Sequence, residues 1–371
     1  MLRIPAIIFA LLSGVHGLIH LIGFTAYWPL AIIQDLPYKT TLLGGKLDLG
    51  GGGMQIFSLL WLLAAVGYLV AAISLLLGKS FWAPLMLASA LLSLVLCVLD
   101  WGVAYRGALI DLVILLVLLV VFGFRQQPAP FPRFTAASSP VETVPLPAGL
   151  PAPVERYFRL TYGDGVPVYT SAVMSGRGTV RFMGITMPGR LRFTHDSGQA
   201  YRHYIETTFY GIPLFKVNES YLDGHTRLEL PFGVVEDAPG VDSAANQGLW
   251  AETFVYPAYL LTDLRLRWEA VDDDTAKLFV PFQDGEQEFR LDFDPQTGMI
   301  IRFETLRYRD EKLGAIRWWG DFIYGTDQNG DPVLENFTAT WEDEGTPWLR
   351  VMFDEKVFNA DIREFIRQKG P

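Results

Sequence analysis

The chain has little cysteine and, over its first third, almost no charge. Cys97 is the single cysteine among 371 residues, so an intrachain disulfide cannot form. The 30 basic and 40 acidic residues are spread unevenly. Residues 1–125 hold six basic and four acidic residues, and the remainder holds 24 basic and 36 acidic residues. The two parts therefore carry +2 and −12. This split excludes a single soluble globule and argues against nucleic acid as a partner.

The sequence also lacks the motifs of several large enzyme classes. It contains no HExxH zinc motif, no nucleophile turn of the G-x-S-x-G type and no glycine-rich phosphate loop ending in Lys-Ser or Lys-Thr. The histidines of the charged part, His195, His203 and His225, have no close second histidine and no cysteine beside them. Clusters of histidine and cysteine normally supply metal ligands, and their lack here predicts no metal site. Since the enzyme motifs above are lacking too, we also predict no cofactor and no catalytic residue.

Four apolar runs fill the first third, at residues 4–27, 54–77, 81–99 and 108–124. A membrane span needs about 20 apolar residues, and four runs in succession predict a four-helix transmembrane domain over residues 1–125. An even number of spans puts both of its ends on one side. Basic residues on that side outnumber those on the opposite side by four to three, which favours a cytoplasmic location for the soluble part.

A few ionisable residues lie within or near these runs. His16 and His20 are four residues apart and share one helix face. The rise per residue places His20, Asp100, Arg106 and Asp111 in one leaflet, away from the soluble part. Ionisable groups in lipid are costly and usually functional, so we pair His20 with Asp111 and Arg106 with Asp100. We interpret the cluster first as a polar clasp between helices, with a proton or small-molecule site and a haem or metal site as alternatives.

The rest of the chain divides into a linker and a β-rich domain. Residues 126–149 are rich in proline, alanine and serine, which predicts an extended, poorly packed linker. Residues 150–371 alternate apolar with polar side chains between turns, which predicts about ten to twelve antiparallel strands with one apolar face. Residues 243–263 have helical spacing instead, and Pro257 is expected to kink or split that helix. The predicted fold is therefore a four-span helical bundle followed by a curved sheet or half-barrel with an inserted helix.

Aromatic side chains of the β domain suggest where a ligand would bind. A curved sheet closed by a helix can enclose an apolar cavity. Glu252 lies in the inserted helix, and Arg265 and Arg267 are its expected ion partners. An ion pair that fastens helix to sheet is favoured over a catalytic carboxylate in an apolar pocket. The predicted cavity residues are Trp250, Glu252, Phe254, Tyr259, Trp268 and Trp318.

Four segments carry a resemblance to a known family. They are GLIHLIGF (17–24), LDWGVAYRGALIDLVILL (99–116), LPAPVERYFRL (150–160) and GLWAETFVYPAYLLTDLRLRWEAVDDDTAKL (248–278). Together they resemble an uncharacterised family of bacterial membrane proteins, a domain of unknown function often found behind four transmembrane helices. The resemblance implies architecture and a bacterial cytoplasmic (inner) membrane, and it assigns no residue roles. More loosely, strands curving around an inserted helix are similar to half-barrel carriers of lipoproteins and lipids.

These observations lead to one expected function and two alternatives. We expect a multi-pass membrane protein whose β domain binds an apolar molecule, a lipid or a lipoprotein, beside the bilayer without catalysis. Its expected partners are membrane lipid and that ligand. The first alternative is a sensor or assembly subunit that docks a partner through its acidic domain. The second is a membrane-tethered enzyme or redox protein that uses Glu252 and Arg267, or His16 and His20. An enclosed apolar pocket favours the expected function, and a large exposed apolar patch favours the first alternative.

Overall fold

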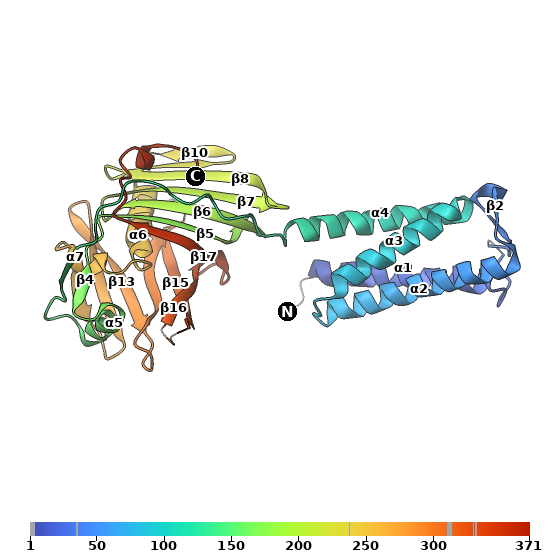
Figure 1. Cartoon of the computed structure of the whole chain (residues 1–371), viewed down its shortest axis with the longest axis horizontal. Helices are drawn as coiled ribbons and strands as arrows, with labels where there is room; N and C mark the ends of the chain where they lie inside the picture. The colour runs from blue at the N-terminus through green and yellow to red at the C-terminus, as the bar shows by residue number, and fades with distance from the viewer. Residues whose placement is uncertain (1–3, 35, 237, 310–313, 329, 331) are drawn as a thin grey trace. The chain divides into compact units, whose positions relative to one another are not determined.

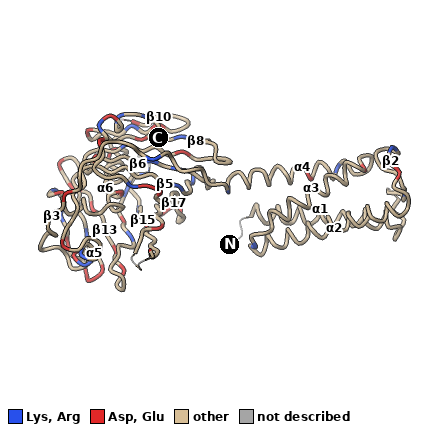
Figure 2. The backbone as a smooth tube through the Cα atoms, viewed as in Figure 1, with Lys and Arg blue, Asp and Glu red and all other residues tan. Residues whose placement is uncertain are grey.

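The computed structural model describes residues 4–34, 36–236, 238–309, 314–328, 330 and 332–371 (Figure 1). Packing divides the chain into two compact units, Met1–Phe122 and Gly123–Pro371. Charged residues are few along the helices of the first unit and frequent along the strands of the second (Figure 2). The boundary between the two units therefore follows the change in composition along the sequence.

The first unit consists of four long helices. Each is long and apolar enough to cross a membrane. The fourth helix begins at Trp101, earlier than the predicted start at residue 108. The helices are α1 Ile4–Tyr27, α2 Gly50–Leu76, α3 Trp82–Leu99 and α4 Trp101–Gly123, and the loop between α1 and α2 holds the short strands β1 Thr41–Leu42 and β2 Leu47–Asp48.

Small residues allow α1 and α2 to pack closely. A Cβ atom at Gly17 would lie 2.6 Å from the Cβ atom of Tyr68 and 3.3 Å from the carbonyl oxygen of Ala65, so only glycine fits there. Large apolar side chains such as Leu12 and Val15 instead point outward and are exposed. An apolar exterior around a closely packed interior suits a bundle surrounded by lipid tails.

The second unit is built on one open sheet of thirteen antiparallel strands in the described part of the chain. The order is β10-β9-β8-β7-β6-β5-β17-β16-β15-β14-β13-β12-β11, so β17 pairs with β5 and joins two runs of hairpins. A separate pair is formed by β3 Thr143–Pro145 and β4 Gly165–Pro167. The bounds of the sheet strands are β5 Ser171–Phe182, β6 Ile185–Asp196, β7 Ala200–Phe209, β8 Ile212–Leu222, β9 His225–Leu230, β10 Gly233–Glu236, β11 Arg267–Ala270, β12 Thr275–Phe282, β13 Gly285–Phe293, β14 Ile300–Tyr308, β15 Ala315–Thr326, β16 Pro332–Trp341 and β17 Pro347–Phe358.

Helix α6 (Pro239–Thr253) lies in the hollow of this sheet (Figure 1). It contacts β8 and β9 near one edge and β12 and β14 near the other, so the sheet must curve around it. The inserted segment is split near Pro257, as predicted, and α7 (Tyr259–Thr262) follows. Helix α5 (Ala152–Tyr162) adds Tyr157 and Phe158 to the same core. The predicted fold class, an apolar four-helix bundle followed by a curved antiparallel sheet with an inserted helix, is confirmed.

The first part of the proline-rich segment that precedes the sheet packs against it. Phe131 and Phe134 are buried. Arg190 and Arg192, on the face of β6 opposite the core, hold their guanidinium groups 4.3 and 5.3 Å from the centre of the Phe131 ring. Arg190 also donates a hydrogen bond to the backbone carbonyl of Ala129 at 3.0 Å. The prediction of a poorly packed linker therefore does not hold around Phe131 and Phe134, which find partners on the sheet, whereas residues 135–145 are exposed.

Candidate functional site

Five of the six predicted cavity residues are aromatic, and their rings fill the interface between helix and sheet. Trp250, Phe254 and Trp318 are buried in the hydrophobic core, and Tyr259 and Trp268 are half-buried against it. The ring of Phe254 stacks on a phenylalanine of β14 with the ring centres 5.2 Å apart. These residues therefore form the packed centre of the domain, as large aromatic side chains in a core usually do.

An apolar cavity does lie on the concave side of the sheet, beside the first turns of α6. Its volume is about 280 Å³, near the lower end of the range for small-molecule sites. None of the six predicted cavity residues lines it. Its apolar wall is formed by Val180, Phe182, Ile205, Val217, Leu228, Leu230, Val241, Ala244, Trp341 and Trp348.

Four charged side chains also line this cavity, those of Arg181, Glu219, Arg307 and Arg309, and Arg307 is the one that binds α6. Nε of Arg307 donates to the carbonyl oxygen of Ala244 at 3.0 Å, and its guanidinium lies 4.3 Å from the centre of the Trp318 ring. Burial lowers the pKa of Arg307, and the negative charge of Glu219 opposes that shift. Since arginine stays charged in proteins, the cavity offers a fixed cation beside an apolar wall.

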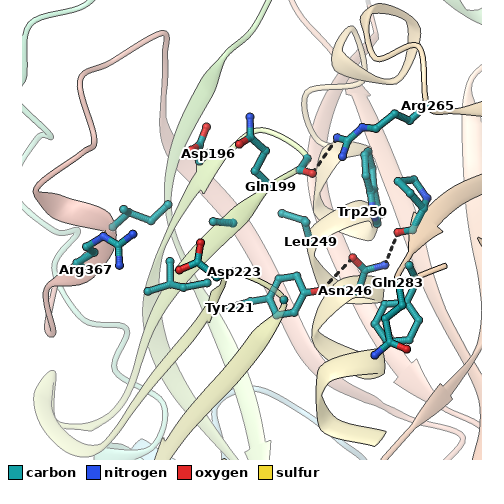
Figure 3. Close-up of a pocket in the computed structure, with 17 residues that line it drawn as sticks. Asp196, Gln199, Tyr221, Asp223, Asn246, Leu249, Trp250, Arg265, Gln283 and Arg367 are labelled. Carbon is teal, nitrogen blue, oxygen red and sulfur yellow. Dashed lines mark hydrogen bonds between the residues drawn. The ribbon is translucent and has the colours of Figure 1, made fainter. Parts of the chain in front are cut away.

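A second hollow, of about 460 Å³, lies beside the other half of α6, and Trp250 lines it (Figure 3). Its walls are mainly polar. Arg265 donates to the carbonyl oxygen of Gly198 at 3.0 Å, and the hydroxyl of Tyr221 donates to Asn246 at 3.4 Å. These polar groups bind one another. Because the walls are mainly polar, the hollow offers little apolar surface and does not suit an apolar ligand.

Glu252, expected to pair with Arg265 or Arg267, lies instead between two histidines. Its Oε2 atom is 2.5 Å from Nε2 of His195 on β6 and 2.8 Å from Nε2 of His203 on β7. The two arginines bind other carboxylates. The predicted partners are therefore wrong, although Glu252 does tie the inserted helix to the sheet. No local sequence pattern links His195 and His203 to this acid, and their convergence on it was not predicted.

His203 is held from its other side by Glu219 and Tyr201. Nδ1 of His203 lies 3.4 Å from Oε2 of Glu219, and the hydroxyl of Tyr201 donates to Oε1 of the same carboxylate at 2.8 Å. The Tyr201 ring stacks on the imidazole with the ring centres 3.8 Å apart and the planes 8° apart. These contacts turn Nε2 of His203 toward Glu252. They also make Glu219 a member of both the histidine cluster and the cavity lining.

Burial and neighbouring charges set the protonation of this cluster. Burial by itself lowers the pKa of His203, but Glu252 and Glu219 outweigh it and raise the pKa to about 9. Burial by itself raises the pKa of Glu252, whereas His203 and His195 lower it to about 2. Burial prevails at His195, and its pKa is lowered. At neutral pH the cluster therefore contains one imidazolium (His203), one neutral imidazole (His195) and two carboxylates (Glu252 and Glu219).

The β domain has a counterpart among protein families. Residues 140–351 match the sequence profile described as "Family of unknown function (DUF6544)". The chain belongs to this family. The matched range contains the apolar cavity and the histidine cluster, and it leaves out the four apolar helices that precede it. The predicted membership of a family of unknown function is confirmed. No curated protein matches the chain.

Solved structures with a similar fold share little sequence with this DUF6544 protein. A LolA superfamily protein from Nitrosomonas europaea is 10% identical with a TM-score of 0.36, over 60% of this chain and 99% of that chain. A DUF1329 family protein from Desulfovibrio piger ATCC 29098 is 11% identical with a TM-score of 0.32, over 57% and 93%. A domain provisionally described as an outer membrane lipoprotein-sorting protein, from Vibrio parahaemolyticus, is 10% identical with a TM-score of 0.31, over 54% and 93%. TM-scores this low give no information about the ligand.

Outside the family match, the helical unit contains a buried polar network centred on Asp111 of α4. Nε2 of His16 lies 2.8 Å from Asp111, and the hydroxyls of Tyr68 and Ser93 donate to the same carboxylate at 2.5 and 2.6 Å. His20 reaches Asp111 only through Ser93, whose hydroxyl lies 2.6 Å from its Nε2 atom. The predicted direct pair of His20 and Asp111 is wrong, because His16, one turn earlier on α1, occupies that position.

Asp100 and Arg106 also have other neighbours than predicted. Asp100 accepts hydrogen bonds from the Tyr27 hydroxyl and from the ammonium group of Lys39. The guanidinium of Arg106 lies 5.5 Å from the centre of the Tyr105 ring. The predicted pair is wrong, because Lys39 in the loop after α1 binds Asp100. Both residues, with the two histidines of α1, line a groove of about 510 Å³ in the bundle.

Proposed function

We propose that this is a multi-pass membrane protein whose β domain binds an acyl chain, of a lipid or of a lipid-modified protein, in the cavity beside α6. The cavity is the observation that carries the proposal, since about 280 Å³ of space is bounded by ten apolar side chains. Burial of each methylene group of a chain is favourable by about 0.8 kcal/mol. Binding of this kind requires no covalent step.

The four apolar helices support a lipid as the ligand. Each is long enough to cross a membrane, and they belong to the same chain as the cavity. A domain tethered in this way stays close to a large supply of acyl chains. An apolar metabolite dissolved in water would have no such advantage, and we therefore favour a ligand that comes from the membrane.

Arg307 adds a polar requirement to the ligand. Its guanidinium lines the cavity and is fixed by the Ala244 carbonyl and the Trp318 ring. A molecule that lays a chain along the apolar wall and brings a carboxylate or phosphate oxygen to Arg307 would satisfy both parts of the site. A pure hydrocarbon would satisfy only one part. The ligand class that fits best is therefore an amphiphile with an acidic head group.

We also propose that the protein resides in a bacterial cytoplasmic (inner) membrane with the β domain on the cytoplasmic side. The four-to-three excess of basic residues on that side of the spans supports this orientation. Trypsin added to inverted vesicles should cleave the β domain, whereas right-side-out vesicles should protect it. Cleavage in right-side-out vesicles would reverse the orientation.

Photoactivatable palmitate, which carries a diazirine in its chain, tests the binding site in the full-length protein purified in detergent. After illumination, peptides are mapped by mass spectrometry. We expect labelling of peptides from β8, β9 and the β16–β17 region, which form the cavity wall. Labels confined to the four helices would contradict the proposal, because detergent-exposed helices bind fatty acids without any site.

A matched pair of variants makes the test specific. Val241 lines the cavity from the first turn of α6, and Val234 on β10 is exposed and does not line it. Val241→Phe fills the cavity and should remove most of the labelling from β8 and β9. Val234→Phe adds the same volume at the surface and should leave it unchanged. Equal labelling of both variants would show that the probe binds elsewhere.

A further inference from the structure

Three side chains from different parts of the β domain meet around one small space. His195 on β6, His203 on β7 and Glu252 near the end of α6 each present one atom able to bind a metal, and these atoms all lie within 4.8 Å of one another. His195 and His203 are buried. Glu252 keeps 16% of its side chain exposed, which leaves a way in from solvent.

We propose that His195, His203 and Glu252 bind one divalent transition-metal ion of the zinc class. Two imidazole nitrogens and one carboxylate oxygen are the donor types that such ions prefer, whereas calcium and magnesium require mainly oxygen donors. Three protein ligands fill three of the four positions of a tetrahedral ion, and binding releases to solvent the proton that His203 carries at neutral pH, because a metal binds only the neutral imidazole. The fourth position remains for water or for a small ligand.

The donor atoms lie closer together than they would around such an ion. Zinc binds histidine nitrogen and carboxylate oxygen at about 2.0–2.2 Å, so two donors of one tetrahedral ion are about 3.4 Å apart. Here the Glu252 oxygen is 2.5 Å from His195 and 2.8 Å from His203. An ion would therefore require the Glu252 carboxylate to withdraw by about 1 Å. Glu252 is the residue before the last of α6 and keeps 16% of its side chain exposed, so we place this shift in the side chain and not in the buried end of the helix.

The surroundings of His203 have the form expected behind a metal-binding histidine. A ligating imidazole usually directs its other ring nitrogen to a carboxylate, which fixes the ring and makes it a better donor. Nδ1 of His203 lies 3.4 Å from Glu219, and Tyr201 in turn donates to Glu219. The Nε2 atom of His203 is close to Glu252 but has no hydrogen bond of good geometry among the described residues. A metal ion bound between the two residues would give this buried nitrogen a partner of suitable geometry.

The site is distinct from the proposed acyl-chain cavity, since none of its three ligands lines that cavity. Metal binding would instead fasten the end of α6 to β6 and β7. The simplest competing explanation is a metal-free ion pair that performs the same fastening. The two explanations differ in one measurable property, which is whether the purified protein holds an ion with nitrogen ligands.

The test uses the full-length protein in detergent, stripped with a chelator, reloaded with Zn²⁺ and freed of excess metal. Elemental analysis should find one zinc per chain. X-ray absorption at the zinc edge of the unaltered protein should show two imidazoles and a carboxylate oxygen. Absence of retained zinc, or a shell without imidazole, overturns the proposal, and this readout does not depend on any variant folding.

Variants then locate the ion. Glu252→Gln and His203→Gln should each weaken zinc affinity by about tenfold or more, as loss of a ligand requires. His225→Gln is the matched control, because His225 is 76% exposed and lies outside the cluster. His16→Gln in the helical unit is a second control. Zinc that survives Glu252→Gln and His203→Gln but is lost in His16→Gln would contradict the proposed site and place the ion among the helices.

Discussion

His195 and His203 lie diagonally across the β6–β7 hairpin and point to the same oxygen atom of Glu252. The hairpin register pairs His195 with Tyr201 and His203 with Phe193, so both imidazoles stand on the concave face. The cluster joins the end of α6 to the middle of the sheet. The free energy of unfolding of the whole domain should therefore depend on the contacts within this cluster.

Glu252→Gln should destabilise the metal-free protein. Removing one partner of a buried ion pair usually costs about 3 kcal/mol, because the remaining charge stays buried. Glu286→Gln is the matched control, since Glu286 pairs with Arg267 at the surface and is 44% exposed. This change should lower the free energy of unfolding by at most about 1 kcal/mol. Thermal unfolding followed by near-UV circular dichroism distinguishes the two. Equal costs would show that the Glu252 pair contributes no more than a surface pair.

Zinc should raise the unfolding temperature of the chelator-stripped wild-type protein. At about 100 times the dissociation constant, a ligand that binds only the folded state adds about 2.7 kcal/mol. His225→Gln should keep this increase, because that histidine is outside the cluster. Glu252→Gln should lose it. An increase of the same size in all three proteins would indicate adventitious binding.

Arg307→Met should weaken binding of an acidic amphiphile to the β domain by about tenfold, the value expected for one hydrogen bond to a charged group. Arg307→Lys keeps the charge and should lose less. Arg317→Met is the surface control, because Arg317 pairs with Glu304 and does not line the cavity. Competition against the photoactivatable palmitate measures all three variants. An unchanged affinity in Arg307→Met would show that the head group does not contact this arginine.

Asp111→Asn should loosen the helical unit. Asp111 is bound by His16, Tyr68 and Ser93, and each such hydrogen bond between membrane helices contributes about 0.6 kcal/mol. We expect the free energy of unfolding, measured in mixed micelles, to fall by about 1–2 kcal/mol. Asp48→Asn changes an exposed aspartate that binds only the backbone of Gly50, and it should have little effect. A stable Asp111→Asn protein would show that the network does not hold the helices together.

Local sequence signals predicted much of the fold. The first apolar run and α1 share the bounds Ile4–Tyr27, since hydropathy alone decides which residues lie in lipid. Pro257 splits the inserted helix as expected, because proline removes a backbone donor. The alternation over residues 150–371 predicts about ten to twelve strands, close to the thirteen of the sheet in the described residues. The Asn-Gly pair at residues 329–330 is typical of a hairpin turn, and it lies partly outside the described residues.

The candidate sites were harder to predict because they depend on contacts between distant segments. The convergence of His195 and His203 follows from the pairing of β6 with β7 across residues 197–199, and the residue types of such a turn do not by themselves determine which strand residues face each other. The third member, Glu252, arrives from a helix whose position on the sheet has no local signal. Its two arginine candidates were chosen because they are near in sequence, and proximity in sequence does not determine which face a side chain occupies.

The position of the cavity also depends on long-range packing. Aromatic residues at the end of α6 were expected to border an apolar cavity, but Phe254 fills the space between helix and sheet and Trp250 borders a mainly polar hollow. The apolar cavity lies beside the first turns, where smaller side chains such as Val241 and Ala244 face the strands. Sequence identifies the apolar face, and the relative sizes of facing residues decide where that face is left open.

Native mass spectrometry of the full-length protein, released from detergent with its bound molecules, tests the central claim most directly. The account predicts one retained amphiphile per chain with an acyl chain and an acidic head group, present in wild type and Val234→Phe and lost from Val241→Phe. Wild-type protein without bound lipid, or the same lipids on Val241→Phe, would contradict it.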